Sequence, residues 1–371
     1  MAVAWIGNRE TLVERAAAHA AALLGSSRCP VFSLDTDIHG TRAAIALAER
    51  VGAAYDHVDG AVVSRETALF TDKGAMTVAP GETRRRADVV VIVGELPQIH
   101  HEFVGELSAT VPDLSAPDLS AKNQREIFLV GSNGTSAPPL SNGRTATLLS
   151  CGEASLGATL AALRAQWKGR QTSQPVSNFD DFTKALEAAH FPVFLFSGDA
   201  TEGLALEMLQ GLITDLNRKS RASGLHLPAS ENGWGSALAS TWMTGFPLRT
   251  GFARGFPEFD PWRYDVARMI AAGEADLHLR ISSSIVQPQK KQTRKNRMAL
   301  IALAKTQEPI AGAAVTIAIG EAGVDHEAVV YSGRTGSLRS IDARAASELP
   351  SAATVIRLVA SHVSAEAALP C

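Results

Sequence analysis

The residues best suited to hold a metal are few and widely spaced in this sequence. Its three cysteines, Cys29, Cys151 and Cys371, are each isolated, so they indicate neither a CxxC metal site nor a disulfide framework. His100-His101-Glu102 and Asp56-His57 bring ligand-type side chains together, but adjacent residues point to different sides of a helix or strand. We therefore predict no metal-binding residue and expect these histidines to be surface or partly buried residues.

Catalysis by a nucleophile or an acid–base pair is equally unsupported. No serine lies in the GxSxG turn that exposes the nucleophile of many hydrolases. Asp325-His326-Glu327 combines acids with a base, but its spacing matches no known catalytic pair, and we expect a turn with a structural hydrogen bond. The sequence thus predicts no catalytic residue.

Two glycine-containing turns could receive a phosphate, at 94–97 and at 198–203. Each follows an expected strand, and backbone N–H groups in such turns bind pyrophosphates. However, Glu95, Asp199 and Glu202 would repel an anion, and neither turn matches GxGxxG. We expect ordinary strand-to-helix turns, with pterin binding as the alternative, and we predict no bound cofactor.

One segment carries an unusual charge. Five cations occupy the eight residues 290–297, and no acidic residue occurs between Asp276 and Glu308. The segment is either a solvated loop between two strands or a contact with an acidic partner. Nucleic acid is disfavoured because no aromatic residue is interleaved with the cations. The candidate partner-binding residues are Lys290, Lys291, Arg294, Lys295 and Arg297.

The composition favours a cytoplasmic protein with more than one core. The 371 residues carry a net charge of −3, so no strong field directs the chain toward nucleic acid. No apolar run reaches the roughly 18 residues of a membrane span, and the first residues lack the pattern of a signal peptide. We expect a soluble protein that contacts neither membrane nor nucleic acid.

The elements that position these residues alternate between strands and helices, which is typical of parallel α/β units. Ala87–Gly94 is predicted to be the clearest strand, because its continuous β-branched run indicates burial on both faces. Further strands are predicted at 30–34, 53–58, 125–130, 145–149, 192–196, 275–281 and 298–304. Helices are predicted at 9–24, 41–51, 155–167, 179–189, 202–221, 266–272 and 352–363.

The same pattern suggests two lobes. The composition of residues 168–176 predicts a linker. We therefore expect one α/β lobe at 1–175, with loop insertions at 108–144. A second lobe at 176–371 would contain an aromatic loop at 232–264 and a C-terminal segment that completes the core.

The aromatic loop is the most distinctive stretch of the chain. Aromatic residues, glycines and prolines alternate there without a regular period, and residues 244–261 are expected to be an ordered irregular loop. Aromatic and arginine side chains dominate protein interfaces, so the loop should be a partner interface or a lid. The candidate partner-binding residues are Phe246, Arg249, Phe252, Arg254, Phe256 and Trp262.

The pattern G-F-x-x-x-x-G-F-x-R-G-F-P-x-F-x-P at 245–261, followed by a helix, A-x-G-E-A-D and a strand, resembles the B subunits of formylmethanofuran dehydrogenases. These belong to the molybdopterin oxidoreductase superfamily. With its modest length and missing cysteines, the chain is most similar to the B subunits of the bacterial formyltransferase/hydrolase branch. The resemblance implies a multi-lobed parallel-sheet α/β fold, the formate dehydrogenase-like core, truncated and without the iron–sulfur domain.

The resemblance also implies a loss of redox chemistry. The dehydrogenases carry an N-terminal cysteine cluster for a [4Fe–4S] centre, whereas this chain has only Cys29 before residue 150. By register, the family's cysteine ligand to molybdenum or tungsten falls at Val62 or Val63, and valine cannot ligate a metal. The alternative is an oxidoreductase subunit with a bound pterin and a metal held by Asp59, Ser64 or His57.

The expected function follows from the family. The resemblance implies a catalytically silent scaffold in a complex that converts formyl-tetrahydromethanopterin to formate through a methanofuran-type carrier. Its partners would be the hydrolase, the transferase and a further structural subunit, with the polyglutamate tail of the carrier as a candidate ligand of the basic segment. A free-standing small-molecule binding protein is the third interpretation.

Overall fold

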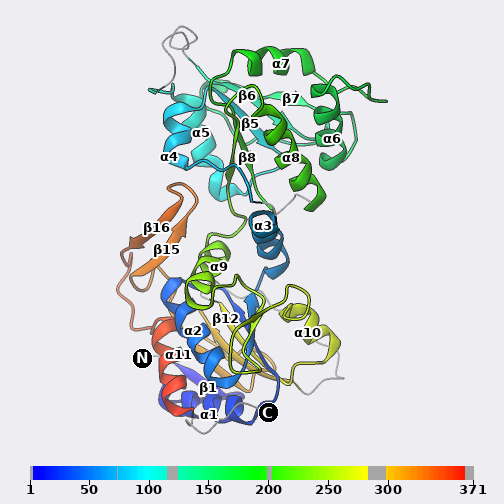
Figure 1. The fold of residues 1–371 in the computed structure, drawn as a ribbon. Helices are drawn as coiled ribbons and strands as arrows, with labels where there is room; N and C mark the ends of the chain where they lie inside the picture. The colour runs from blue at the N-terminus through cyan, green and yellow to red at the C-terminus, as the bar shows by residue number, and fades with distance from the viewer. Residues whose placement is uncertain (1–2, 73, 115–123, 199–202, 283–297, 364–371) are drawn as a thin grey trace. The chain divides into compact units, whose positions relative to one another are not determined.

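The computed structural model describes residues 3–72, 74–114, 124–198, 203–282 and 298–363 (Figure 1). The chain forms two compact units. Unit 1 comprises Met1–Ser64, Ser230–Tyr331 and Leu338–Cys371, and unit 2 comprises Arg65–Ala229 and Ser332–Ser337. Within the described ranges, no helix is long and apolar enough to cross a membrane.

Unit 1 is built on a mixed sheet. Its strands are β1 (Ala4–Ile6), β2 (Arg9–Thr11), β3 (Pro30–Leu34), β4 (Ala54–His57), β10 (Thr250–Gly251), β11 (Glu258–Phe259), β12 (Leu277–Ser282), β13 (Ala299–Ala304) and β14 (Val315–Ala318). They lie in the order β11-β10-β4-β3-β12-β13-β14-β1-β2. The five from β4 to β14 are parallel, while β1, β2, β10 and β11 add antiparallel edges.

Helices cover both faces of this sheet. The larger core lies under α1 (Val13–Ser26), α2 (Ile38–Val51), α9 (Glu231–Thr244) and α11 (Ala352–His362), which pack on one another. The smaller α10 (Val266–Ala272) packs on β3 and β4 from a separate cluster around Met269. Because both faces are covered, β3 is buried at every position, as its apolar sequence predicts.

Unit 2 has a five-stranded sheet whose pairings are all parallel. It consists of β5 (Val89–Val93), β6 (Glu126–Val130), β7 (Thr147–Leu149), β8 (Val193–Phe196) and β9 (Ser223–His226), in the order β7-β6-β5-β8-β9. The β-branched run of β5 shows why both faces must be apolar. Val89, Val91 and Val93 enter one core, and Val90 and Ile92 enter the other.

The helices of unit 2 divide between these two cores. The cluster that contains Val91 also receives residues of α6 (Leu156–Trp167), α7 (Phe179–Ala188) and α8 (Gly203–Leu216). The cluster that contains Ile92 also receives residues of α5 (His101–Ala109). Two short helices, α4 (Pro80–Arg86) and η1 (Gln98–His100), precede α5 in the chain. Remaining elements are α3 (Gly60–Asp72), the short helix η3 (Ser141–Gly143), and the two-stranded sheet of β15 (Ala328–Ser332) and β16 (Ser337–Ile341).

The expected α/β class with parallel sheets is confirmed, and most predicted elements are present within a few residues. The helix expected from Arg9 is an exception, because residues 9–11 pair with β1 as strand β2 and the helix begins at Val13. The helices α3, α4, α5 and α9 were not predicted. The first residues of the expected aromatic loop belong to α9, whose N-cap Ser230 accepts a hydrogen bond from Gly233 N at 3.0 Å.

The two units do not coincide with the expected lobes at 1–175 and 176–371. Residues 168–176 lie inside unit 2, where the Val176 side chain enters the core and its backbone N–H donates to Gln166 Oε1 at 2.7 Å. Most of unit 2, Arg65–Ala229, is instead inserted between residues 64 and 230 of unit 1, and Ser332–Ser337 form a second, short insertion. Strands β3 and β12 are neighbours although they are more than two hundred residues apart in sequence, and local patterns carry no signal for such a pairing.

Candidate functional site

The aromatic loop leaves the end of α9 and returns along the edge of unit 1's sheet. Gly245 ends α9 with a φ of 82°, in the left-handed region that favours glycine. The chain then pairs β10 with β4 and β11 with β10, so the loop adds two short strands to the sheet. The irregular segment expected at 244–261 is therefore held by backbone pairing at its centre.

Arg249 fixes the inner side of this loop. Its guanidinium contacts Asp56 (Nε to Oδ2, 3.1 Å) and Asp265 (Nη2 to Oδ2, 2.9 Å), and Nη1 donates to Pro261 O at 2.6 Å. Asp265 also caps α10 by accepting from Arg268 N. One buried arginine thus joins β4, the loop and α10. These contacts explain why Arg249 is buried despite its charge, and they correct the expectation that Arg249 faces a partner.

The electrostatics of this cluster are unbalanced, because one guanidinium faces two carboxylates. Burial raises the pKa of Asp56 to about 7, against the opposing effect of Arg249, and the charge of Asp265 adds to the rise. The contacts of the cluster join elements of unit 1 to one another, so its role is to position the loop.

Phe252 also belongs to the inner side. Its side chain is 2% exposed and its ring stacks on Tyr55 with centroids 6.1 Å apart. The Tyr55 hydroxyl lies 2.7 Å from Ser240 Oγ of α9, so this ring pair ties the loop to the core. Phe252 is therefore a core residue, and the expectation that its ring contacts a partner is wrong because the chain's own core covers it.

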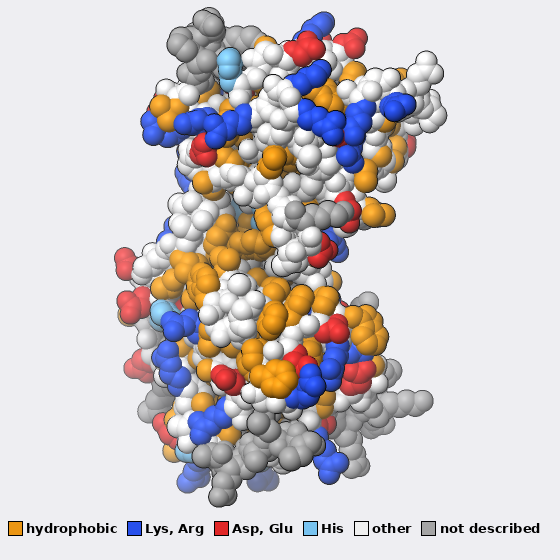
Figure 2. Space-filling view, viewed as in Figure 1, with side chains coloured by type: hydrophobic (Ala, Val, Ile, Leu, Met, Phe, Trp, Pro, Cys, Tyr) orange, Lys and Arg blue, Asp and Glu red, His pale blue; other side chains and the backbone are white. Residues whose placement is uncertain are grey.

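The exposed aromatic side chains that follow α9 form what we call the outer face: Phe246, Phe256, Phe259 and Trp262. Trp262 is 71% exposed and Phe256 51%. Phe246 and Phe259 stack with centroids 6.1 Å apart, and Trp242 and Met243 at the end of α9 are exposed as well. Figure 2 shows hydrophobic side chains gathered over the front of unit 1, with charged side chains beside them.

Arginines hold the exposed rings in place. Arg268 lies over Trp262, 4.3 Å from the ring centroid, and Arg254 lies over Phe256 at 5.2 Å. Each arginine is itself paired with a carboxylate, Arg268 with Glu274 and Arg254 with Glu258. The charges of the outer face are thus compensated locally, which leaves ordered apolar rings as its main feature.

The other predicted residues are not part of this face. Lys290, Lys291, Arg294, Lys295 and Arg297 lie outside the described residues. His100 is buried and its Nε2–H donates to Pro228 O at 2.8 Å, while His101 Nε2 contacts Leu96 O at 3.0 Å. Asp325 Oδ2 accepts from Glu321 N at 2.8 Å, which is the structural hydrogen bond expected in that turn.

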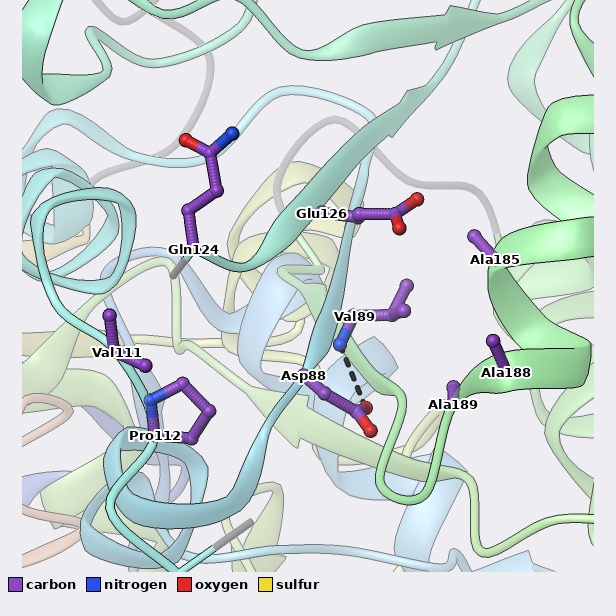
Figure 3. A pocket seen from close by; sticks show the side chains of 9 residues that line it. All are labelled: Asp88, Val89, Val111, Pro112, Gln124, Glu126, Ala185, Ala188 and Ala189. Atoms are coloured by element: carbon purple, nitrogen blue, oxygen red, sulfur yellow. Dashed lines mark hydrogen bonds between the residues drawn. The ribbon is translucent and has the colours of Figure 1, made fainter. Parts of the chain in front are cut away.

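Two cavities of unit 2 are weaker candidates for a functional site than the outer face, because Asp88 in one and Arg164 in the other already have partners. The first is a cavity of about 20 Å³ beside Asp88 at the amino ends of β5 and β6, with room for about one water (Figure 3). Asp88 accepts there from Val89 N and Phe191 N, so its carboxylate is committed to the backbone. The second, between α3 and α8, measures about 790 Å³, and its Arg164 is paired with Asp215 at 2.7 Å.

Comparison with known proteins identifies the family. No protein-family model matches the chain. The chain is 36% identical over 281 residues to the B subunit of the formyltransferase/hydrolase complex Fhc of Methylorubrum extorquens, covering 76% of this chain and 74% of that protein. It superposes on a chain in the crystal structure of the M. extorquens FhcABCD complex with methylofuran with a TM-score of 0.83, at 32% identity and over 97% and 98% of the two chains. The chain belongs to the family of B subunits of formyltransferase/hydrolase complexes.

More distant relatives extend this result. The B subunit of the tungsten-containing formylmethanofuran dehydrogenase 2 of Methanocaldococcus jannaschii is 23% identical over 80% of this chain and 70% of that protein. The resemblance carried by the pattern at 245–261 is therefore confirmed.

The tungsten-containing relatives raise the question of a metal in this chain. The residues present do not fit one held by a thiolate. Val62 and Val63 lie in the first turn of α3, and Val63 is buried in the core of unit 1, where it approaches Gly233 so closely that a Cβ there would lie 2.7 Å from Val63 Cγ2. His57 Nδ1 accepts a hydrogen bond from Asp59 N at 3.0 Å. Within the described ranges, no three His, Cys, Asp or Glu side chains gather as a metal site would require.

Proposed function

We propose that this chain is a structural, non-redox subunit of a cytoplasmic formyltransferase/hydrolase complex of one-carbon metabolism. The complex would convert formyl-tetrahydromethanopterin to formate through a formyl-methanofuran-type carrier. The likeness to an FhcABCD chain over nearly the full length of both chains carries this proposal. The resemblance places the dehydrogenase ligand at Val62 or Val63, and valine cannot ligate a metal, which supports the non-redox part.

The outer face of the aromatic loop is the surface proposed to hold a partner subunit. Ordered aromatic side chains beside arginines are typical of interface hot spots, because rigid rings lose little conformational entropy on binding. Local ion pairs cancel the charges of Arg254 and Arg268, so apolar contact should dominate the affinity. The partners would be the hydrolase, the transferase and a further structural subunit.

The basic segment has a second proposed role. Lys290, Lys291, Arg294, Lys295 and Arg297 would attract an acidic partner surface or the polyglutamate tail of the carrier. Such an attraction is screened within about 10 Å at 0.1 M salt, so it should weaken as salt rises.

Purification of the native complex tests the proposal. We expect the chain to copurify with transferase and hydrolase subunits and to contain less than about a tenth of an equivalent of Mo, W or Fe, because thiolate ligands are missing. Stoichiometric Mo or W would favour the alternative, a pterin-containing oxidoreductase subunit with a metal held by Asp59, Ser64 or His57. Purification as a stable monomer without these subunits would contradict the scaffold role.

A further inference from the structure

The carboxyl edge of unit 2's sheet holds a buried glutamate. Glu66 on α3 is 1% exposed, and its Oε1 accepts from Gly198 N at 2.9 Å and from Ala229 N at 3.0 Å. His226 Nε2 lies 3.1 Å from the same oxygen. Gly198 follows β8 and Ala229 follows β9, so one carboxylate gathers the backbone N–H groups that follow two neighbouring strands.

The strand order identifies this edge as the one where related α/β sheets bind ligands. The chain runs outward from β5 through β6 to β7, and then returns to β8 beside β5 before it continues to β9. This is the order of the dinucleotide-binding α/β fold, and its topological switch point lies between β5 and β8. In such sheets ligands bind in the crevice outside the carboxyl ends, where backbone N–H groups and helix ends receive phosphates. Glu66 binds the N–H groups that follow β8 and β9, so it lies at the same edge of the sheet as the switch point.

The local packing is built around the carboxylate. A Cβ at Gly198 would clash with Glu66 Cγ, so only glycine permits this approach. Arg65 Nη1 donates to Gly198 O at 2.6 Å, so consecutive residues of α3 bind both backbone groups of Gly198. In the part of the chain that the structure describes, Glu66 Oε2 and Ser197 Oγ are buried without a hydrogen-bond partner, a costly state for polar atoms.

We propose that Glu66 is a built-in anion, whose carboxylate occupies a site for a carboxylate or phosphate at the carboxyl edge of unit 2. In dinucleotide-binding units with this strand order, the phosphates of the ligand supply the negative charge at this edge. In this unit the Glu66 carboxylate of α3 supplies it. The turn after β5 supports this proposal. Its sequence, Gly94-Glu95-Leu96-Pro97, lacks the further glycines that bring a backbone close to a pyrophosphate. The intact protein should therefore exclude free anions from this site.

Chemical rescue of the full-length chain tests the assignment. Glu66→Ala removes the anion and should lower the melting temperature by at least about 5 °C, since charge-assisted hydrogen bonds are lost. Sodium acetate or phosphate should restore part of this loss in a saturable way, whereas sodium chloride at equal ionic strength should not. The wild type should show no difference between these salts.

Two further variants control the experiment. Glu66→Gln keeps an oxygen for the two N–H groups but loses the charge, so it should fold, melt below the wild type and gain nothing specific from acetate. Glu102→Ala makes the same change in net charge at an exposed position, and should show no anion-specific effect. If Glu66→Ala does not fold in chloride, its recovery in acetate becomes the measurement.

Two results would overturn the proposal and leave Glu66 as an ordinary helix-to-strand contact. The first is equal behaviour of Glu66→Ala in acetate, phosphate and chloride. The second is the absence of any loss of stability in either Glu66 variant. Neither result bears on the proposed subunit role, which rests on the family and on unit 1.

Discussion

The inner and outer sides of the aromatic loop differ in what their similar residues do. Phe252 and Arg249 are enclosed by β4, α9 and α10, whereas Phe256 and Trp262 stand at the surface with Arg254 and Arg268 over their rings. The inner pair stabilises the fold of unit 1. The outer rings contribute little to the stability of unit 1. Ordered apolar rings at a protein surface are typical of a site that a binding partner covers. Residue type alone therefore does not distinguish a side chain that anchors the core from one that can contact a partner.

Replacement of Phe252 by Ala should give the largest effect on stability. Truncation of a buried Phe typically costs about 3–5 kcal/mol, and here the stacking on Tyr55 is also lost. Denaturant unfolding of the isolated subunit measures the change, with Phe256→Ala as the matched control at an exposed position. We expect the control to lose less than about 1 kcal/mol. Equal losses in both variants would abolish the distinction between the two sides.

Replacement of Arg249 by Met should be nearly as costly. It leaves Asp56 and Asp265 without their shared cation, and removal of one partner from a buried ion pair costs roughly 3 kcal/mol. Arg263→Met, an exposed arginine of the same loop, is the control. A loss no larger than that of the control would show that the guanidinium does not hold the inner side. The measurement is the free energy of unfolding of each variant at pH 8.

The pH dependence of stability should come from the inner side. The pKa of Asp56 is raised to about 7 in the folded protein, so between about pH 4 and 7 the folded state binds more protons than the unfolded state. Its contribution to stability is therefore present below about pH 4 and is lost as pH rises to 7. Relative to Asp56→Asn, the wild type should lose roughly 3 kcal/mol over that range. Parallel pH profiles for the two proteins would contradict the raised pKa.

The sequence predicted the periodic parts of this fold well. Pro30–Leu34 and Val266–Ala272 have the expected bounds, because a buried strand and a capped helix each leave a local pattern. The division into units was not predicted, because the neighbours β3 and β12 belong to distant segments. The helix α9 was missed because Gly233 and Gly235 within it are poor helix formers, tolerated here by tight contacts with Val63 and Ile38.

The sequence predicted where the candidate site lies in the chain, but not which of its aromatic side chains are buried. The pattern at 245–261 located the loop, since clustered rings and glycines are conspicuous in an alanine-rich chain. It could not assign Phe252 to the core and Phe256 to the surface, because both follow a glycine in similar G-F dipeptides. Which ring enters the core depends on the pairing of β10 with β4, a contact between segments nearly two hundred residues apart.

The outer face is tested most directly by assembly of the complex with a variant chain that carries both Phe256→Ala and Trp262→Ala. The association of this variant with the other subunits is titrated and compared with wild type and with Leu204→Ala, an equally exposed apolar side chain of unit 2. We predict an unchanged melting temperature of the isolated variant and an affinity weakened at least about 30-fold, which corresponds to about 2 kcal/mol. Wild-type affinity of a fully folded double variant would contradict the role of this face as the partner-binding surface.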